Sequence, residues 1–134
     1  MELILVLVIT GFVVWGSTPA KPDNLALSAL NSDEQVTITE GKFWYQFSPS
    51  GSNPQTGFIF YPGGRIDYRA YAPLMREIAQ GGYAVFLVKM PLNLAVFGQN
   101  RADTILEAYP EISNWYIGGH SLGGAMAAAY VYNN

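Results

Sequence analysis

A glycine-rich turn near the end of the chain, Gly119-His120-Ser121-Leu122-Gly123, constrains the fold most tightly. The apolar run Trp115–Ile117 before it predicts a buried strand, and the Ala-rich run Ala125–Ala129 after it predicts a helix. A sharp turn from strand to helix strains its apex, so the positions two residues away on either side must be nearly free of side-chain atoms. The two outer glycines fit that need, which makes Ser121 a candidate nucleophile. The spacing alone is weak evidence, because a turn that merely joins two elements would also satisfy it.

The composition of the chain excludes several kinds of partner and of functional site. The chain has 134 residues, the length of one domain at most, and a formal net charge of −3 with only 7 Lys+Arg. We therefore expect no basic patch and no nucleic-acid partner. There is no cysteine, which excludes disulfides, a Cys nucleophile and thiolate metal sites. Because His120 is the single histidine, a His-rich metal site is implausible, and we expect neither a metal nor a cofactor.

The first segment of the chain is almost wholly apolar from Leu3 to Gly16 and has no amphipathic period. Its length lies between a signal-peptide core and a full membrane span of about 20 residues. No basic residue precedes it, unlike in a signal peptide, and Trp15 suits a membrane interface. We predict that residues 1–18 are a membrane anchor that contacts the membrane through residues 3–16. The main alternative is a cleaved signal peptide.

The remainder divides into a linker and a domain. Residues 19–34 hold two prolines, small polar residues and one possible helical turn, which indicates a linker. Residues 35–134 form the predicted domain. It begins with two strands, Gln35–Thr39 and Lys42–Ser48, that a turn at Glu40-Gly41 joins into an antiparallel hairpin.

Three short apolar runs then alternate with helical patterns. Gly57–Tyr61, Tyr83–Val88 and Trp115–Ile117 have the character of strands covered on both faces. Tyr71–Ala79 and Ala102–Tyr109 predict the helices between them. Such alternation means parallel strands joined by right-handed crossovers. The predicted fold class is α/β: a β-hairpin followed by a mostly parallel sheet flanked by helices.

Two loops leave the carboxyl edge of this sheet with free backbone N–H groups. One is the turn at Ser121, where the N–H of Leu122 opens a helix. The other is Pro62-Gly63-Gly64-Arg65, directly after the Gly57–Tyr61 strand. Since ligands gather at this edge, the N–H of Leu122 and that of Gly64 or Arg65 are candidate donors to an oxyanion. An ordinary turn is the alternative for the Pro-Gly-Gly sequence.

Gly118–Gly124 resembles the nucleophile elbow of the α/β-hydrolase superfamily. Phe60–Gly64 with Tyr71–Leu74 resembles the oxyanion loop and first helix of a bacterial branch of small esterase- and dienelactone-hydrolase-like proteins, often with an N-terminal hydrophobic segment. Lys89–Ala95 is similar to the loop that follows the next strand in that branch. The resemblance implies that the Gly57–Tyr61 strand lies between the other two predicted parallel strands. It also implies a bacterial envelope location, by an N-terminal membrane anchor or by export.

The catalytic base is missing from the sequence. In this superfamily an Asp or Glu and then a His follow the serine, but no acidic residue or His follows Ser121. His120 precedes the serine directly and points away from it, so we expect a packing or hydrogen-bonding role beneath the elbow. Asp67, Asp103 and Glu107 are expected to be surface charges or helix caps. We predict an incomplete α/β-hydrolase fold, a fragment that is poorly soluble and a poor catalyst alone.

Two functions remain open. The first is a serine hydrolase that acts on small-molecule esters or related acyl compounds through Ser121. The second is a membrane-tethered, non-catalytic binding protein that has the elbow but lacks the catalytic acid and His. Nucleotide binding does not fit, because the glycines lack the spacing of a phosphate loop or of a dinucleotide fingerprint.

Overall fold

The computed structural model describes all 134 residues, and a single mixed sheet forms its centre. Its strands are β1 (Val36–Glu40), β2 (Trp44–Pro49), β3 (Thr56–Tyr61), β4 (Ala84–Val88) and β5 (Asn114–Gly119). The α-helices are α1 (Glu2–Ser17), α2 (Asn24–Ser28), α3 (Ala72–Gln80), α4 (Arg101–Ala108) and α5 (Leu122–Asn133). Three short 3-10 helices lie in the loops: η1 (Tyr68–Tyr71), η2 (Pro91–Asn93) and η3 (Ala95–Phe97).

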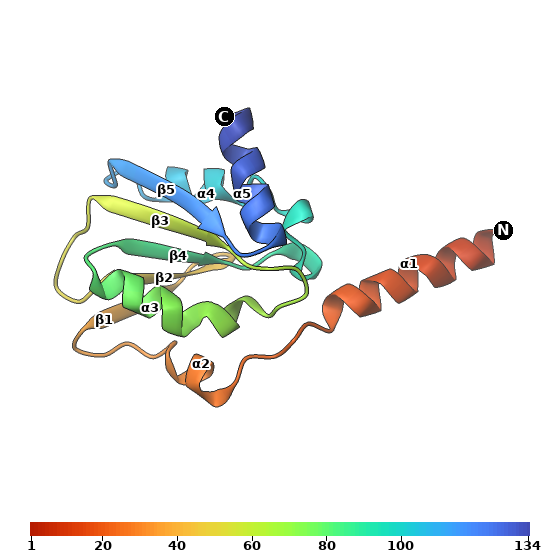
Figure 1. Cartoon of the computed structure of the whole chain (residues 1–134), viewed down its shortest axis with the longest axis horizontal. Helices are drawn as coiled ribbons and strands as arrows, with labels where there is room; N and C mark the ends of the chain where they lie inside the picture. The colour runs from red at the N-terminus through yellow and green to blue at the C-terminus, as the bar shows by residue number, and fades with distance from the viewer.

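The strand order is β1-β2-β4-β3-β5 (Figure 1). β1 and β2 form the predicted antiparallel hairpin, and β2 pairs antiparallel with β4. β3 pairs in parallel with both β4 and β5. The prediction that the Gly57–Tyr61 strand lies between the other two parallel strands is therefore confirmed. This order brings the carboxyl ends of β3 and β5 together, where the two candidate loops begin.

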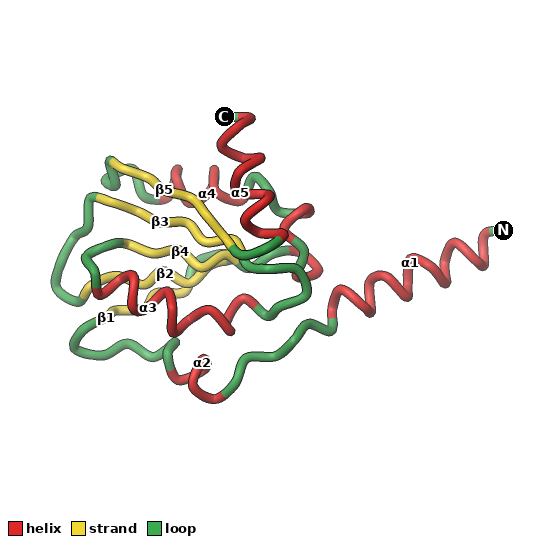
Figure 2. Tube along the Cα trace, viewed as in Figure 1, coloured by secondary structure: helices red, strands yellow, loops and turns green.

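Helices cover both faces of the sheet, so the α/β fold class is confirmed (Figure 2). Every residue of β4 is buried, and its side chains alternate between two cores. Phe86 and Val88 pack with residues of α4 and α5 on one face. Val85 and Leu87 pack with residues of α3 on the other. An apolar run without polar alternation is what such a two-sided position requires.

β5 lies at an edge of the sheet and pairs only with β3. Its residues alternate between exposed and half-buried, and the Tyr116 side chain is 65% exposed. The expectation of a strand buried on both faces is thus wrong for β5. The apolar run Trp115–Ile117 does not by itself indicate burial on both faces, because an edge strand can carry aromatic residues on an uncovered face.

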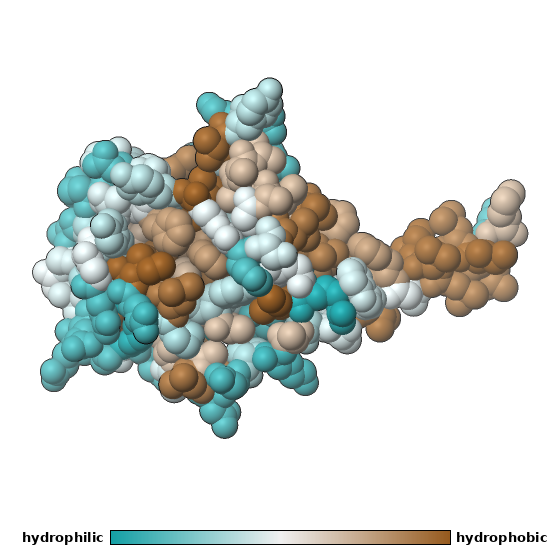
Figure 3. Space-filling view, viewed as in Figure 1, coloured by the Kyte–Doolittle hydropathy of each residue, from teal (hydrophilic) through white to brown (hydrophobic).

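α1 projects from the body of the protein as a single apolar helix (Figures 1 and 3). It has 16 residues, about 24 Å of helix. No helix in the structure combines the length and the apolar character needed to cross a bilayer. A helix that spans the membrane is therefore not supported, and the membrane anchor over residues 1–18 stays a prediction.

The segment between α1 and β1 packs on the domain. Ala20 pairs with Ile66 in an isolated parallel bridge, and Ala26 of α2 is buried. The Arg76 guanidinium of α3 donates to the carbonyls of Ala29 and Asn31. These contacts bring the start of residues 19–34 alongside the loop that follows β3 and the later part against α3.

Candidate active site

Ser121 occupies the apex of the turn between β5 and α5. Its φ of 52° and ψ of −120° lie in a strained backbone region that residues other than glycine rarely adopt. The residue is exposed at the carboxyl end of the sheet and caps α5. The turn predicted from the sequence is therefore present, and it presents the serine to solvent as a nucleophile elbow does.

The flanking glycines are required by the backbone that surrounds them. A Cβ on Gly119 would lie 2.4 Å from the carbonyl oxygen of Tyr61. A Cβ on Gly123 would lie 2.2 Å from the same oxygen and 2.4 Å from that of Pro62. Because both obstacles are backbone atoms, neither can move aside cheaply. The Gly-x-Ser-x-Gly spacing thus lets the elbow press against the end of β3.

The loop after β3 lies directly beside the start of α5. A Cβ on Gly64 would be 3.3 Å from Cδ2 of Leu122. Leu122 is the first residue of α5, and the N–H groups of a first helical turn have no partner within the helix. The N–H of Gly64 makes no hydrogen bond in the structure. The two residues therefore bring free N–H groups to the same side of the sheet, next to Ser121.

Arg65 does not offer its N–H to a ligand. That group donates to the Asn93 carbonyl at 2.8 Å. The Arg65 carbonyl accepts from the N–H of Ala20, also at 2.8 Å. Of the two alternatives raised by the sequence, only Gly64 keeps a free donor. The role of Asn93 was not predicted, although Asn tolerates the positive φ of 54° that it adopts here.

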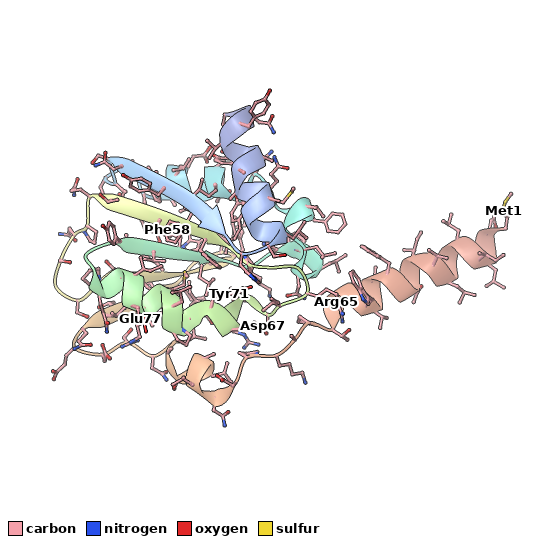
Figure 4. All side chains as sticks on the ribbon, in the orientation of Figure 1. Met1, Phe58, Arg65, Asp67, Tyr71 and Glu77 are labelled. Atoms are coloured by element: carbon pink, nitrogen blue, oxygen red, sulfur yellow. The ribbon has the colours of Figure 1, made fainter.

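His120 is tied to the oxyanion loop through Tyr71. Its backbone N–H donates to the Tyr61 carbonyl at 3.1 Å, and its Nδ1 lies 2.9 Å from the Tyr71 hydroxyl. The same hydroxyl accepts from the N–H of Gly63 at 3.0 Å. Burial raises the pKa of Tyr71, so the hydroxyl stays protonated at neutral pH. Figure 4 shows Tyr71 between α3 and the elbow, with Arg65 toward α1.

Tyr71 is a site residue that the sequence did not reveal. It stood inside a segment predicted as a helix, and nothing in its spacing indicated a hydroxyl aimed at the elbow. The structure places it in η1, ahead of α3, where its ring contacts Phe60 and its hydroxyl reaches across the loop.

The acidic residues before the elbow serve structural roles or face solvent. Asp67 caps η1 and pairs with Arg69, whose hydrogen bond holds the pKa of that carboxyl below its usual range. Asp103 accepts a hydrogen bond from the Tyr130 hydroxyl. Glu107 is exposed. None of the three forms a hydrogen bond with Ser121 or His120.

A surface hollow of about 610 Å³ lies away from this chemistry. Thr56 and Asn114 at the amino ends of β3 and β5 line it, together with Phe58, Ile78, Tyr83 and Tyr116. Since Ser121 and Gly64 stand at the carboxyl ends of the same strands, the hollow is not part of the site. It marks the sheet face that β5 leaves uncovered.

The profile of the Alpha/beta hydrolase family matches residues 57–134, more than half of the chain. The chain belongs to the Alpha/beta hydrolase family. No curated protein sequence is a significant match. The matched region begins within β3 and includes the oxyanion loop, the elbow and α5.

Solved structures of other α/β-hydrolases share the fold of this chain. An esterase/lipase from an uncultured bacterium superposes with a TM-score of 0.60 at 14% identity, and it covers 81% of this chain. A thermostable esterase from Pseudomonas putida ECU1011 gives a TM-score of 0.57 at 19% identity, with the same coverage. This α/β-hydrolase chain spans 42% of the length of either esterase. At such identities the likeness concerns the fold alone.

Proposed function

We propose that this chain carries the nucleophile and oxyanion-binding half of a serine hydrolase that acts on ester or related acyl bonds. The observation that carries the proposal is the strained backbone of Ser121 beside the unpartnered N–H of Gly64. A merely connecting turn has no need of a positive φ at a serine, which costs on the order of 1–3 kcal/mol. The esterases with a similar fold support the substrate class.

In the proposed reaction, Oγ of Ser121 attacks the carbonyl carbon of the substrate. Its proton passes to a general base, and the carbonyl oxygen becomes an oxyanion. The N–H groups of Leu122 and Gly64 donate to that oxyanion. Because these backbone dipoles are already fixed in place, they stabilise the oxyanion more strongly than water would. Neither donor is a side chain, so the glycines around them set the geometry.

The general base lies outside the residues described here. The only imidazole is that of His120, and its Nδ1 is engaged with the Tyr71 hydroxyl. The chain spans 42% of the compared esterases, and we propose that residues corresponding to the remainder supply the acid and the His.

Active-site labelling tests the proposal. The full-length product of the gene would be treated with a fluorophosphonate probe, which reacts with an activated serine. We expect one label on Ser121 in the wild-type protein and none in Ser121→Ala. A folded wild-type protein that takes no label would contradict the proposal.

A non-catalytic binding protein with the same fold is the second candidate. The engagement of His120 with Tyr71 favours it, because no base then faces Ser121 within the chain. The two candidates differ in one measurement. A binding protein would retain a small acyl ligand in equilibrium dialysis without converting it, whereas the hydrolase would release product.

A further inference from the structure

α1 exposes apolar side chains all around its axis. Large hydrophobic residues from Leu3 to Trp15 are each at least 42% exposed (Figure 3). A helix that is apolar on every side is typical of an apolar environment rather than of water. Its tip, in contrast, carries Glu2 and the amino terminus.

The base of α1 is fixed to the domain by hydrogen bonds. The Arg65 guanidinium donates to the carbonyls of Trp15 at 3.0 Å and Thr18 at 2.8 Å, and lies 4.6 Å over the Trp15 ring. Nδ2 of Asn93 donates to the Gly16 carbonyl at 2.9 Å. These contacts supply donors to carbonyls at the C-terminal end of the helix, where the last turn leaves acceptors without helical partners. The helix therefore leaves the domain at a defined place, beside the oxyanion loop.

A pocket of about 490 Å³ opens at this base and is lined by basic residues. Lys42, Lys89 and Arg101 lie in its wall together with Ser17, the last residue of α1, and no carboxylate lines it. The Arg101 guanidinium donates to the Lys89 carbonyl and stacks 4.3 Å over the Phe43 ring. With Arg65, we call these four residues the root cluster.

The root cluster is unusual in a chain with a net charge of −3. It holds four of the seven basic residues, and none of the four pairs with a carboxylate. The two salt bridges of the chain use Arg69 and Arg76 instead. The carboxylate of Asp67 is bonded to Arg69, and that hydrogen bond is the main cause of its lowered pKa, to which the charge of Lys89 also contributes. The fold thus creates a basic patch that composition did not predict.

We propose that the root cluster binds the phosphate headgroups of an anionic phospholipid layer while α1 lies along that layer, with its side chains in the apolar part just beneath the headgroups. An apolar helix beside unpaired cations matches the two parts of a lipid surface, whereas a soluble phosphate compound would leave α1 in water. A second copy of the chain would cover α1 but would bring a second root cluster of the same charge. Glu2 at the tip keeps that end near the headgroups too, since a carboxylate is costly in the apolar layer. The inference does not depend on catalysis.

Vesicle flotation of the full chain tests the inference. The protein would be mixed with vesicles of phosphatidylcholine alone or of phosphatidylcholine with phosphatidylglycerol. We expect stronger binding to the anionic vesicles, weakening as salt is raised to about 0.15 M. Lys42→Gln/Lys89→Gln should weaken that binding about thirtyfold, at about tenfold per 1.4 kcal/mol and roughly 1 kcal/mol per basic residue.

Arg69→Gln/Arg76→Gln is the matched control, because it also removes two positive charges, both outside the root cluster, and leaves α1 unchanged. Both lysines are exposed, so we expect their replacement to leave the fold intact, and circular dichroism would verify the fold of each variant. Three results would overturn the inference. The first is equal binding to both kinds of vesicle. The second is release of the protein from the vesicles by inorganic phosphate at constant ionic strength. The third is a dimer, detected by sedimentation velocity, that buries α1 and does not bind vesicles.

Discussion

The hydroxyl of Tyr71 lies 2.9 Å from Nδ1 of His120 and so joins the oxyanion loop to the nucleophile elbow. The Tyr71 oxygen already accepts from the N–H of Gly63, which leaves its own proton free for Nδ1. In this arrangement the single histidine of the chain acts as a support for the site. No hydrogen bond links this histidine to the side chain of Ser121.

Tyr71→Phe tests that support. The change leaves the N–H of Gly63, a buried residue, without a partner, so we expect a loss of about 1–3 kcal/mol in the free energy of unfolding. Urea denaturation measures it. Tyr132→Phe is the control, because Tyr132 is 91% exposed and its hydroxyl forms no hydrogen bond. Equal stability of the two variants would mean that the Tyr71 hydroxyl contributes nothing.

Gly119→Ala and Gly123→Ala test the close approach of the elbow to β3. Each new methyl group would collide with the Tyr61 carbonyl, so we expect each to lower the free energy of unfolding by about 3 kcal/mol or more. Gly118→Ala is the matched control, since its Cβ would meet only side-chain atoms, the edge of the Phe58 ring at 3.3 Å, and no backbone. A Gly123→Ala variant with an unchanged free energy of unfolding would show that the elbow does not press closely against the Tyr61 carbonyl.

Ser121→Gly tests the strain at the apex. Glycine accepts a φ of 52° and ψ of −120° without steric cost, so we expect the variant to be about 1 kcal/mol more stable than the wild type. Ser121→Ala keeps the Cβ and should show no gain in the same urea titration. A less stable glycine variant would argue that the serine is not strained.

The Asp67 carboxylate predicts a pH dependence of stability. Its pKa is lowered in the folded protein by the hydrogen bond from Arg69, below a reference value of about 3.9. The stabilisation is therefore fully present above about pH 5 and is lost as the pH falls through the folded pKa. Unfolding measured between neutral and acidic pH should show a shallower decline in Asp67→Asn. Glu107→Gln, at an exposed carboxylate without hydrogen bonds, should follow the wild-type curve.

Tyr116 on the open edge strand predicts self-association. Its side chain is 65% exposed beside an uncovered apolar hollow, and an unpaired edge of this kind invites another chain. Tyr116→Lys should lower the light scattering of concentrated protein several-fold. Tyr132→Lys adds the same charge on α5 and serves as the control. Equal scattering of the two variants would locate the association elsewhere, with α1 as the next surface to test.

The sequence predicted those parts of the fold that depend on local pattern. The hairpin, the positions of the three parallel strands along the chain and the glycine turn at Ser121 follow from apolar runs and small residues, whereas the order of those strands in the sheet was implied by the family resemblance. The burial of β5 was mispredicted, because Trp115–Ile117 reports hydrophobicity and not the presence of a neighbour on each side. Long-range hydrogen bonds could also not be predicted from the sequence. The N–H of Arg65 and the hydroxyl of Tyr71 have partners that only the folded chain brings near.

Arg65 has a practical consequence for anyone who shortens this protein to improve its behaviour in solution. Cutting away the apolar helix would also take the Trp15 carbonyl, one of two acceptors of the guanidinium, and the ring beneath it. Gly64, the next residue back along the chain, carries the free N–H proposed for catalysis. A shortened protein that begins before Trp15 keeps that support, whereas one that begins at Lys21 also loses the Ala20 N–H that bonds to the Arg65 carbonyl.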